Sequence, residues 1–152
     1  MKLFAFALAL AAAACSGGAP DLAASRAWAR ETLAGQDSAA AYLTIANRGR
    51  GNDRLVAVST PAARDSSLHR SSSEGGISRM RPLKQGLEIP AGGTAALGPG
   101  GDHIMLSGLH QPLRRGTAIQ LRLEFERSPD LTVQLHVLDA AGAGPAAGHA
   151  GH

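Results

Sequence analysis

The fold class is decided by residues 117–138, TAIQLRLEFERSPDLTVQLHVL. In the first half of this run, every second residue from 119 to 125 is apolar and the residues between them are polar. Residues 131–138 repeat the alternation. A period of two is typical of a β-strand with one buried face. Because Ser128-Pro129-Asp130 between the halves is a turn signal, the run predicts an antiparallel hairpin.

Shorter runs of the same kind, broken by Gly, Pro, Asn and Asp, fill the central part of the chain. They predict further strands at residues 40–46, 55–59, 66–69, 77–81, 87–89, 94–97 and 103–107. Helical periodicity is weak, and no solenoid-type repeat is found. The sequence therefore predicts an all-β fold, a single-domain β-sandwich or barrel with Greek-key connections.

Composition narrows the possible functions. The chain has 152 residues and one cysteine, which excludes an intramolecular disulfide framework and CxxC-type redox or zinc sites. Aromatic residues make up 3%, too few for a platform that stacks nucleic-acid bases. The 15 Lys and Arg residues against 12 Asp and Glu give a net charge of +3 and are spread along the chain rather than forming a stripe. We therefore expect no nucleic-acid partner.

The N-terminus reads as an export signal. Lys2 is followed by an apolar run over residues 3–14, which is too short to span a bilayer but fits the apolar part of a signal peptide. Small residues lead into Cys15, and this pattern resembles a bacterial lipoprotein signal whose cysteine is acylated. The alternative is ordinary cleavage near Ala14, which leaves a free thiol. We expect a signal peptide over residues 1–14, a lipid anchor on Cys15 and a periplasmic location.

Four segments follow from this pattern. The signal peptide precedes a small, polar tether at 15–26 and a β-sandwich domain at 27–139. Residues 140–152 contain mostly Ala and Gly with Pro and His, and they read as a flexible tail.

The sequence offers no catalytic constellation. It has no Gly-x-Ser-x-Gly elbow, no phosphate-binding Gly-Lys loop and no prominent carboxylate pair, so we do not expect an enzyme. The histidines and methionines are more informative. His103 and Met105 would face the same side of a strand. Ten residues separate His69 from Met80, and 22 separate Met80 from His103. Both gaps allow strand returns, so the four side chains could converge at one end of a sandwich.

The donor types select the metal. Thioether sulfur is soft and uncharged, which suits Cu(I) and makes it a poor ligand for Mg, Ca or Mn. A zinc site would more often contain cysteine or carboxylate beside the histidines. The alternative interpretation is that the methionines fill the core and the histidines are surface or core residues.

These residues resemble the signature of the PCuAC family of periplasmic copper chaperones: His, ten residues, Met, about 21 residues, then His-x-Met. Further segments are similar to the family, namely residues 28–30, 41–47, 53–56, 89–93 and 100–106. The resemblance implies a cupredoxin-like β-sandwich that binds Cu(I) through His69, Met80, His103 and Met105. It also implies delivery of copper to respiratory oxidase, especially the CuA centre of cytochrome c oxidase.

Asp102 departs from the family, which often has an aromatic residue there; its carboxylate could alter hydrogen bonding around the site and metal access. His149 and His152 could recruit copper loosely, Cu(II) included. We expect His136 and His110 to be solvated, and Trp28 and Tyr42 to pack.

The resemblance implies that the partner is a copper-accepting oxidase subunit or another copper chaperone. We expect the chain to be a monomer. The alternatives are copper storage, a non-metal β-sandwich lipoprotein for adhesion or assembly, a copper-dependent thiol oxidoreductase, and zinc or nickel handling.

Overall fold

The computed structural model describes residues 17–139 and 141. Throughout this part of the chain the regular structure is β, with no helix and hence none able to span a membrane. The strands are β1 (Leu22–Arg30), β2 (Ser38–Asn47), β3 (Asp53–Ser59), β4 (Ala63–Glu74), β5 (Ile77–Pro82), β6 (Leu87–Ile89), β7 (Thr94–Ala96), β8 (Asp102–Leu109), β9 (Ala118–Phe125) and β10 (Leu131–Leu138). The predicted signal peptide, Cys15, and the tail histidines His149 and His152 lie outside the described residues.

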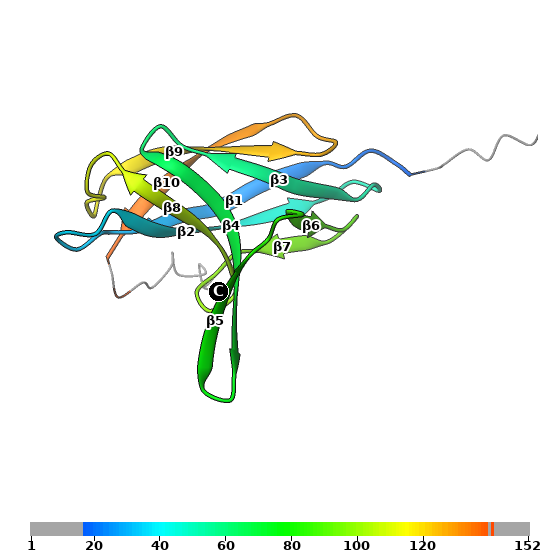
Figure 1. Cartoon of the computed structure of the whole chain (residues 1–152). Coiled ribbons are helices and arrows are strands. Elements are labelled where there is room, and N and C mark those ends of the chain that lie inside the picture. The colour runs from blue at the N-terminus through cyan, green and yellow to red at the C-terminus, as the bar shows by residue number, and fades with distance from the viewer. Residues whose placement is uncertain (1–16, 140, 142–152) are drawn as a thin grey trace, which may run out of the picture.

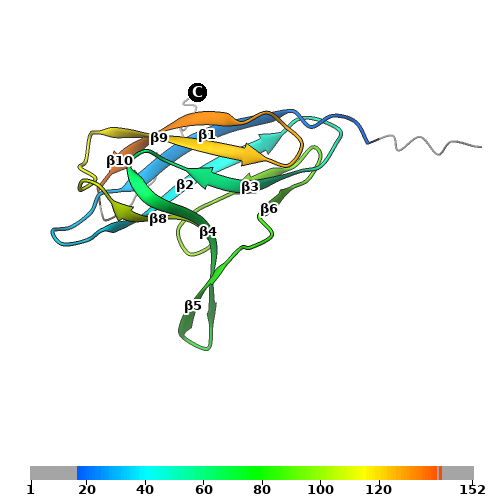
Figure 2. The same cartoon turned by 45° about the horizontal axis from the view of Figure 1, so that its top comes forward.

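The strands form one continuous sheet in the order β5-β4-β8-β2-β1-β10-β9-β3-β6, and β7 also pairs with β2. Every pairing is antiparallel except that of β1 with β10. The sheet curls back on itself, so that β3 and β9 lie over the layer that contains β2 (Figures 1 and 2). The predicted all-β sandwich is confirmed.

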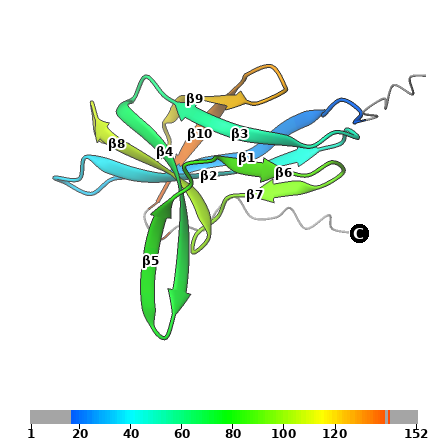
Figure 3. The ribbon, with the colours of Figure 1, turned by 45° about the vertical axis from the view of Figure 1, so that its right-hand side comes forward.

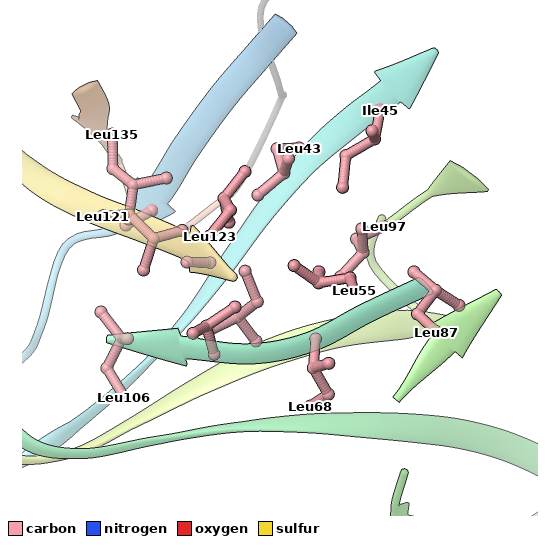
Figure 4. Close-up of a cluster of buried hydrophobic side chains, with 14 of the residues drawn as sticks. Leu43, Ile45, Leu55, Leu68, Leu87, Leu97, Leu106, Leu121, Leu123 and Leu135 are labelled. Carbon is pink, nitrogen blue, oxygen red and sulfur yellow. The ribbon is translucent and has the colours of Figure 1, made fainter. Parts of the chain in front are cut away.

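The hairpin predicted at residues 117–138 is formed by β9 and β10. Leu123 pairs with Leu131, and Leu121 pairs with Val133. Leu121, Leu123 and Leu135 are fully buried, as the period-two pattern requires. In Figure 4 their side chains point towards those of Leu43 and Ile45 on β2, across the interior of the sandwich. Apolar burial in this interior is the main stabilising force of the fold.

β1 begins at Leu22, inside the segment that the sequence assigned to a tether ending at residue 26. Its sequence, LAASRAWAR, has no clean alternation. A bulge interrupts its pairing with β2 between Ser25 and Trp28, and Arg26 has a positive φ of 53°. Pairing with β2 and β10 on either side forms this strand despite its weak pattern. Trp28 is buried beside Tyr42, with ring centroids 4.6 Å apart, which confirms the packing role expected of both.

The residues just before β1 are also attached to the sandwich. The Asp21 N–H donates to Asn47 Oδ1 at 3.1 Å. Arg127 Nη2 donates to the Gly18 carbonyl at 3.2 Å. Residues 18–21 therefore extend the folded unit rather than hang from it.

A buried carboxylate connects the start of β3 to the turn between β9 and β10. Asp53 accepts hydrogen bonds from the backbone N–H groups of Arg54, Arg127 and Ser128, at 2.8–2.9 Å, and from the Ser128 hydroxyl. Burial alone would raise the pKa of Asp53, but together these donors lower it below its usual value. Asp53 is therefore a charged group held inside the fold by hydrogen bonds.

β5 and the distal half of β4 project from the sandwich as a two-stranded arm, residues 70–82, which we call the hairpin arm (Figures 1 and 3). All six residues of β5 are exposed. Its turn is Gly75-Gly76, with φ values of 58° and 78°, left-handed angles that glycine adopts without strain and that close a tight hairpin.

Candidate metal centre

Two of the four predicted ligands lie directly opposite each other on neighbouring strands. His69 of β4 pairs with His103 of β8, and their rings stack with centroids 5.8 Å apart and planes at 28°. Their chain neighbours Leu68 and Ile104 are buried in the hydrophobic core. Because side chains alternate along a strand, both imidazoles lie on the other face of the sheet.

Met105 lies on the same face as this histidine pair. It is two residues beyond His103 on β8 and pairs with Ser67. Its exposure is intermediate, so the thioether belongs to the body of the sandwich while retaining some access to solvent.

Met80 lies on the hairpin arm. It pairs with Ser71, which is two residues beyond His69 on β4, so the register places it on the histidine face as well. In a flat ladder this register would put its Cα about 8 Å from that of His69. Met80 is 51% exposed. Met105 and Met80 lie on opposite sides of the histidine row, Met105 on β8 in the body of the sandwich and Met80 on the arm.

The His103 imidazole is held in one tautomer. It is 5% exposed, and its Nδ1 lies 3.1 Å from the Gly101 carbonyl oxygen. Because a carbonyl can only accept, Nδ1 carries the proton and Nε2 keeps its lone pair for a ligand. The same carbonyl accepts the N–H of Ser71 at 3.1 Å, which ties the base of the arm to this imidazole. Metal-binding histidines are commonly oriented in this way.

The His69 imidazole has an unsatisfied nitrogen. Its Nε2 lies 2.8 Å from the Ser67 hydroxyl, while Nδ1 is buried and has no hydrogen-bond partner among the described residues. A buried polar atom without a partner costs about 1–3 kcal/mol. Burial first, and then the neighbouring His103, lower the pKa of His69 below its usual value. This favours the neutral imidazole, which is the form that coordinates metals.

The Asp102 carboxylate is engaged away from the imidazoles. It pairs with Arg70 through two contacts, Nε to Oδ1 at 2.6 Å and Nη2 to Oδ2 at 2.9 Å. Arg70 and Asp102 form the cross-strand pair next to the histidine pair, so alternation puts them on the opposite face. The sequence raised the possibility that Asp102 alters hydrogen bonding at the site; its bidentate partner is Arg70 instead.

The donor set is nitrogen and sulfur rather than oxygen. Across the described residues, no group of three or more His, Cys, Asp or Glu side chains is placed to hold a metal ion. His136 on β10 and His110 after β8 are exposed, as expected for solvated residues. Ser67 and the Gly101 carbonyl were not identified from sequence; a hydroxyl two residues before a histidine on the same strand was the available signal for Ser67.

A pocket of about 730 Å³ lies elsewhere. It runs along the β1 bulge and β10 and is lined by Trp28, His136 and the 116–117 turn. It offers one imidazole and no sulfur, so its lining does not resemble the donor set of the histidine pair.

Comparison with known proteins gives a family and a set of structural neighbours. The family model described as "Putative lipoprotein LpqE-like" matches residues 22–137. "Putative lipoprotein Lxx21020" of Leifsonia xyli subsp. xyli (strain CTCB07) is 38% identical over 119 residues, which cover 78% of this chain and 70% of that protein.

Solved structures similar to this chain include a copper-bound PCuAC domain and the DR1885 protein. The solution structure of CuI-DR1885 from Deinococcus radiodurans has a TM-score of 0.60 and 31% identity, covering 77% of this chain and 76% of the other. Apo-DR1885 has a TM-score of 0.57 and 30% identity, covering 91% and 94%. The copper-bound PCuAC domain from PmoF2 has a TM-score of 0.66 at 22% identity, covering 78% and 92%, and shows the fold alone.

Proposed function

This chain belongs to the LpqE-like lipoprotein family and shares the fold of PCuAC domains, and from this premise we propose that it is a Cu(I)-binding chaperone outside the cytoplasm. The observation that carries the proposal is the cross-strand pair of His69 and His103. His103 has Nε2 available for a ligand, His69 has an unsatisfied Nδ1, and a thioether lies on the same face. The chain holds copper as cargo and is not an enzyme.

The proposed ligands are His69, Met80, His103 and Met105. Two imidazoles and two thioethers form a neutral set, which favours the singly charged cuprous ion over Cu(II). A metal at the unsatisfied nitrogen of His69 would also remove the cost of burying it. The three donors of the body would hold the ion, and Met80 would approach it from the arm.

Exposed thioether ligation suits a carrier. A chaperone must hold Cu(I) and also release it, and a thiolate-containing acceptor binds soft metals more strongly than thioethers do. Transfer to such an acceptor therefore runs downhill. We place the acceptor at the CuA centre of cytochrome c oxidase, or at another copper chaperone, with the carrier anchored in the periplasm through lipidated Cys15.

The first experiment is a competition titration with a chromophoric Cu(I) chelator. We expect about one Cu(I) per chain, with sulfur neighbours in the X-ray absorption spectrum. His136→Ala is the matched control and should leave the affinity unchanged, because this imidazole lies on β10, away from the site. Failure to take up Cu(I), or a loaded site without sulfur neighbours, would overturn the carrier function.

A second pair of measurements addresses the finer parts of the proposal. Removing residues 140–152 tests whether His149 and His152 bind Cu(II), which would appear as a second, weaker site lost on truncation. Mixing the loaded chain with a soluble CuA domain, separating the two and measuring copper in each tests delivery. Copper that stays with the chain would favour storage.

A further inference from the structure

The hairpin arm ends the sheet with an unpaired strand. β5 is the first strand in the sheet order and pairs only with β4 among the described strands. It projects away from the sandwich, so no described strand covers its outer edge (Figure 3). An exposed edge is a ready template for strand addition unless it is blocked.

The register shows which backbone groups are open. The two-residue Gly75-Gly76 turn closes on the pair Glu74 and Ile77, which is therefore a hydrogen-bonded pair. Hydrogen-bonded and non-bonded pairs then alternate down the ladder. Ser78 and Met80 consequently direct their N–H and C=O groups to the open edge, which leaves the backbone of the proposed ligand Met80 available to a partner.

The charge of the arm selects the partner. Arg79 and Arg81 are exposed, and neither forms an ion pair within the described part of the chain. They line a shallow hollow of about 320 Å³ together with Arg70, Ser72 and Glu74 on the face opposite Met80. Antiparallel pairing of two copies of β5 would bring arginines together, which disfavours self-association. An acidic strand would be attracted.

We propose that β5 is the docking strand for an extended, acidic segment of the copper-receiving protein. The segment adds to the sheet edge, pairs with the backbone of Ser78 and Met80, and places carboxylates beside Arg79 and Arg81. Docking would bring the receiver to the backbone of the most exposed proposed ligand. The identity of the partner as a copper receiver rests on the proposed function, whereas docking itself does not require copper.

The test uses two synthetic peptides, one alternating Glu and Val and its twin alternating Lys and Val, added to the copper-free chain. We expect the acidic peptide to bind and to slow amide exchange at Ser78 and Met80 by about tenfold or more. Glu88, on the other edge strand β6, is the internal control and should be unaffected. Equal binding of both peptides, or binding without protection of Ser78 and Met80, would overturn the proposal.

Two variants separate charge from backbone pairing. The double variant Arg79→Glu/Arg81→Glu should weaken binding of the acidic peptide by about tenfold. Ser78→Pro removes an outward N–H while leaving the hydrogen bonds to β4 in place, so it should abolish binding, whereas Ser78→Ala should not change it. If Ser78→Pro unfolds the arm, the Arg79 amide will exchange rapidly. In that case the Arg79→Glu/Arg81→Glu variant alone tests whether the arm docks the acidic peptide.

The same experiments distinguish two other binding partners of the arm, a lipid surface and a second copy of the chain. Vesicles containing phosphatidylglycerol, if they bind through Arg79 and Arg81 while the acidic peptide does not, would make the arm a membrane contact and overturn strand docking. The chain could instead form a dimer that Ser78→Pro abolishes and that the acidic peptide does not dissociate. This result would also overturn docking of an acidic segment.

Cu(I) titration of Arg79→Glu/Arg81→Glu keeps the two proposals distinguishable. These arginines lie on the face opposite Met80, so the affinity for Cu(I) should stay within about twofold. A chain that binds the peptide but not Cu(I) would refute the copper function and leave the docking strand standing. A chain that binds Cu(I) but not the peptide would refute the docking strand and leave the copper function standing.

Discussion

The sandwich body and the hairpin arm have opposite designs. In the body, the large side chains with no exposure come from strands on both layers, including β2, β3, β8 and β9. In the arm, β5 is exposed throughout, and Ile77 and Met80 remain 59% and 51% exposed. The proposed metal site lies where the two meet. The body supplies both histidines and Met105, and the arm supplies Met80. The buried body therefore provides the stability of the fold, whereas the exposed arm provides access to the proposed ligands.

The largest effect should come from a cavity in the body. Leu123 is fully buried, so Leu123→Ala should lower the free energy of unfolding by about 3 kcal/mol. The matched change on the arm, Ile77→Ala, should alter it by no more than about 0.5 kcal/mol. Urea denaturation followed by circular dichroism measures both. Similar losses in the two variants would show that the arm contributes to the core and would break the comparison.

The buried carboxylate of the body should give the next largest effect. Asp53→Asn keeps the volume but loses the charge that four donors stabilise, so it should cost about 2 kcal/mol at pH 7. Because folding lowers the pKa of Asp53, its contribution is present above the unfolded pKa, close to 3.8, and is lost as the pH falls through the folded value.

Urea denaturation of the unmodified chain and of the Asp53→Asn variant, at pH 7 and at pH 3, measures this dependence. The difference in unfolding free energy between the two chains should shrink at the acidic pH. A difference that grows on acidification would contradict the assigned sign.

The two methionines should separate binding from stability. Met80→Leu should weaken Cu(I) binding by at least about tenfold, since losing a group that merely orients a ligand already costs about 10–100-fold. It should leave unfolding unchanged within about 0.5 kcal/mol, because the arm is exposed. Met105→Leu should weaken binding similarly and also cost up to about 1.5 kcal/mol of stability. Unchanged copper affinity in both variants would refute the ligand set.

The smallest effect should come from the ion pair at the junction. Arg70 is largely exposed, with 57% of its side chain accessible, so solvent screens its pairing with Asp102. Asp102→Asn should cost no more than about 1 kcal/mol. Copper affinity should stay the same, because this pair lies on the face away from the histidines. A marked fall in affinity would place the carboxylate in the site after all.

The body was largely predictable from the sequence, and the reason is visible in β9 and β10. One buried face imposes strict alternation, which fixes both the strand and its orientation. β1 lacks this signal because LAASRAWAR is rich in alanine and does not alternate apolar with polar residues. Its strand is formed by the neighbours on each side. Sequence therefore placed the start of the folded unit too late, at residue 27.

The sequence predicted which residues make up the candidate site, but not how they are arranged in space. Spacing indicated that His103 and Met105 share a face. It could not give the register that sets His69 against His103, because cross-strand pairing depends on turns elsewhere in the chain. The separation of Met80 on a projecting arm follows from that register and has no local sequence pattern. Ser67 and Gly101 each lie two residues before their histidine, and of these contacts only the Ser67 hydroxyl left a signal in the sequence.

The attachment of residues 18–21 to the sandwich changes how this protein would search for a partner. A free tether over residues 15–26 could extend about 40 Å. With Gly18 bound to Arg127, the proposed anchor at Cys15 would be three residues from the folded unit, about 10 Å at full extension. A lipid on Cys15 would therefore keep the sandwich at the bilayer surface and confine its diffusion to two dimensions. Encounter with a membrane-bound receiver would then depend on lateral density rather than on bulk concentration.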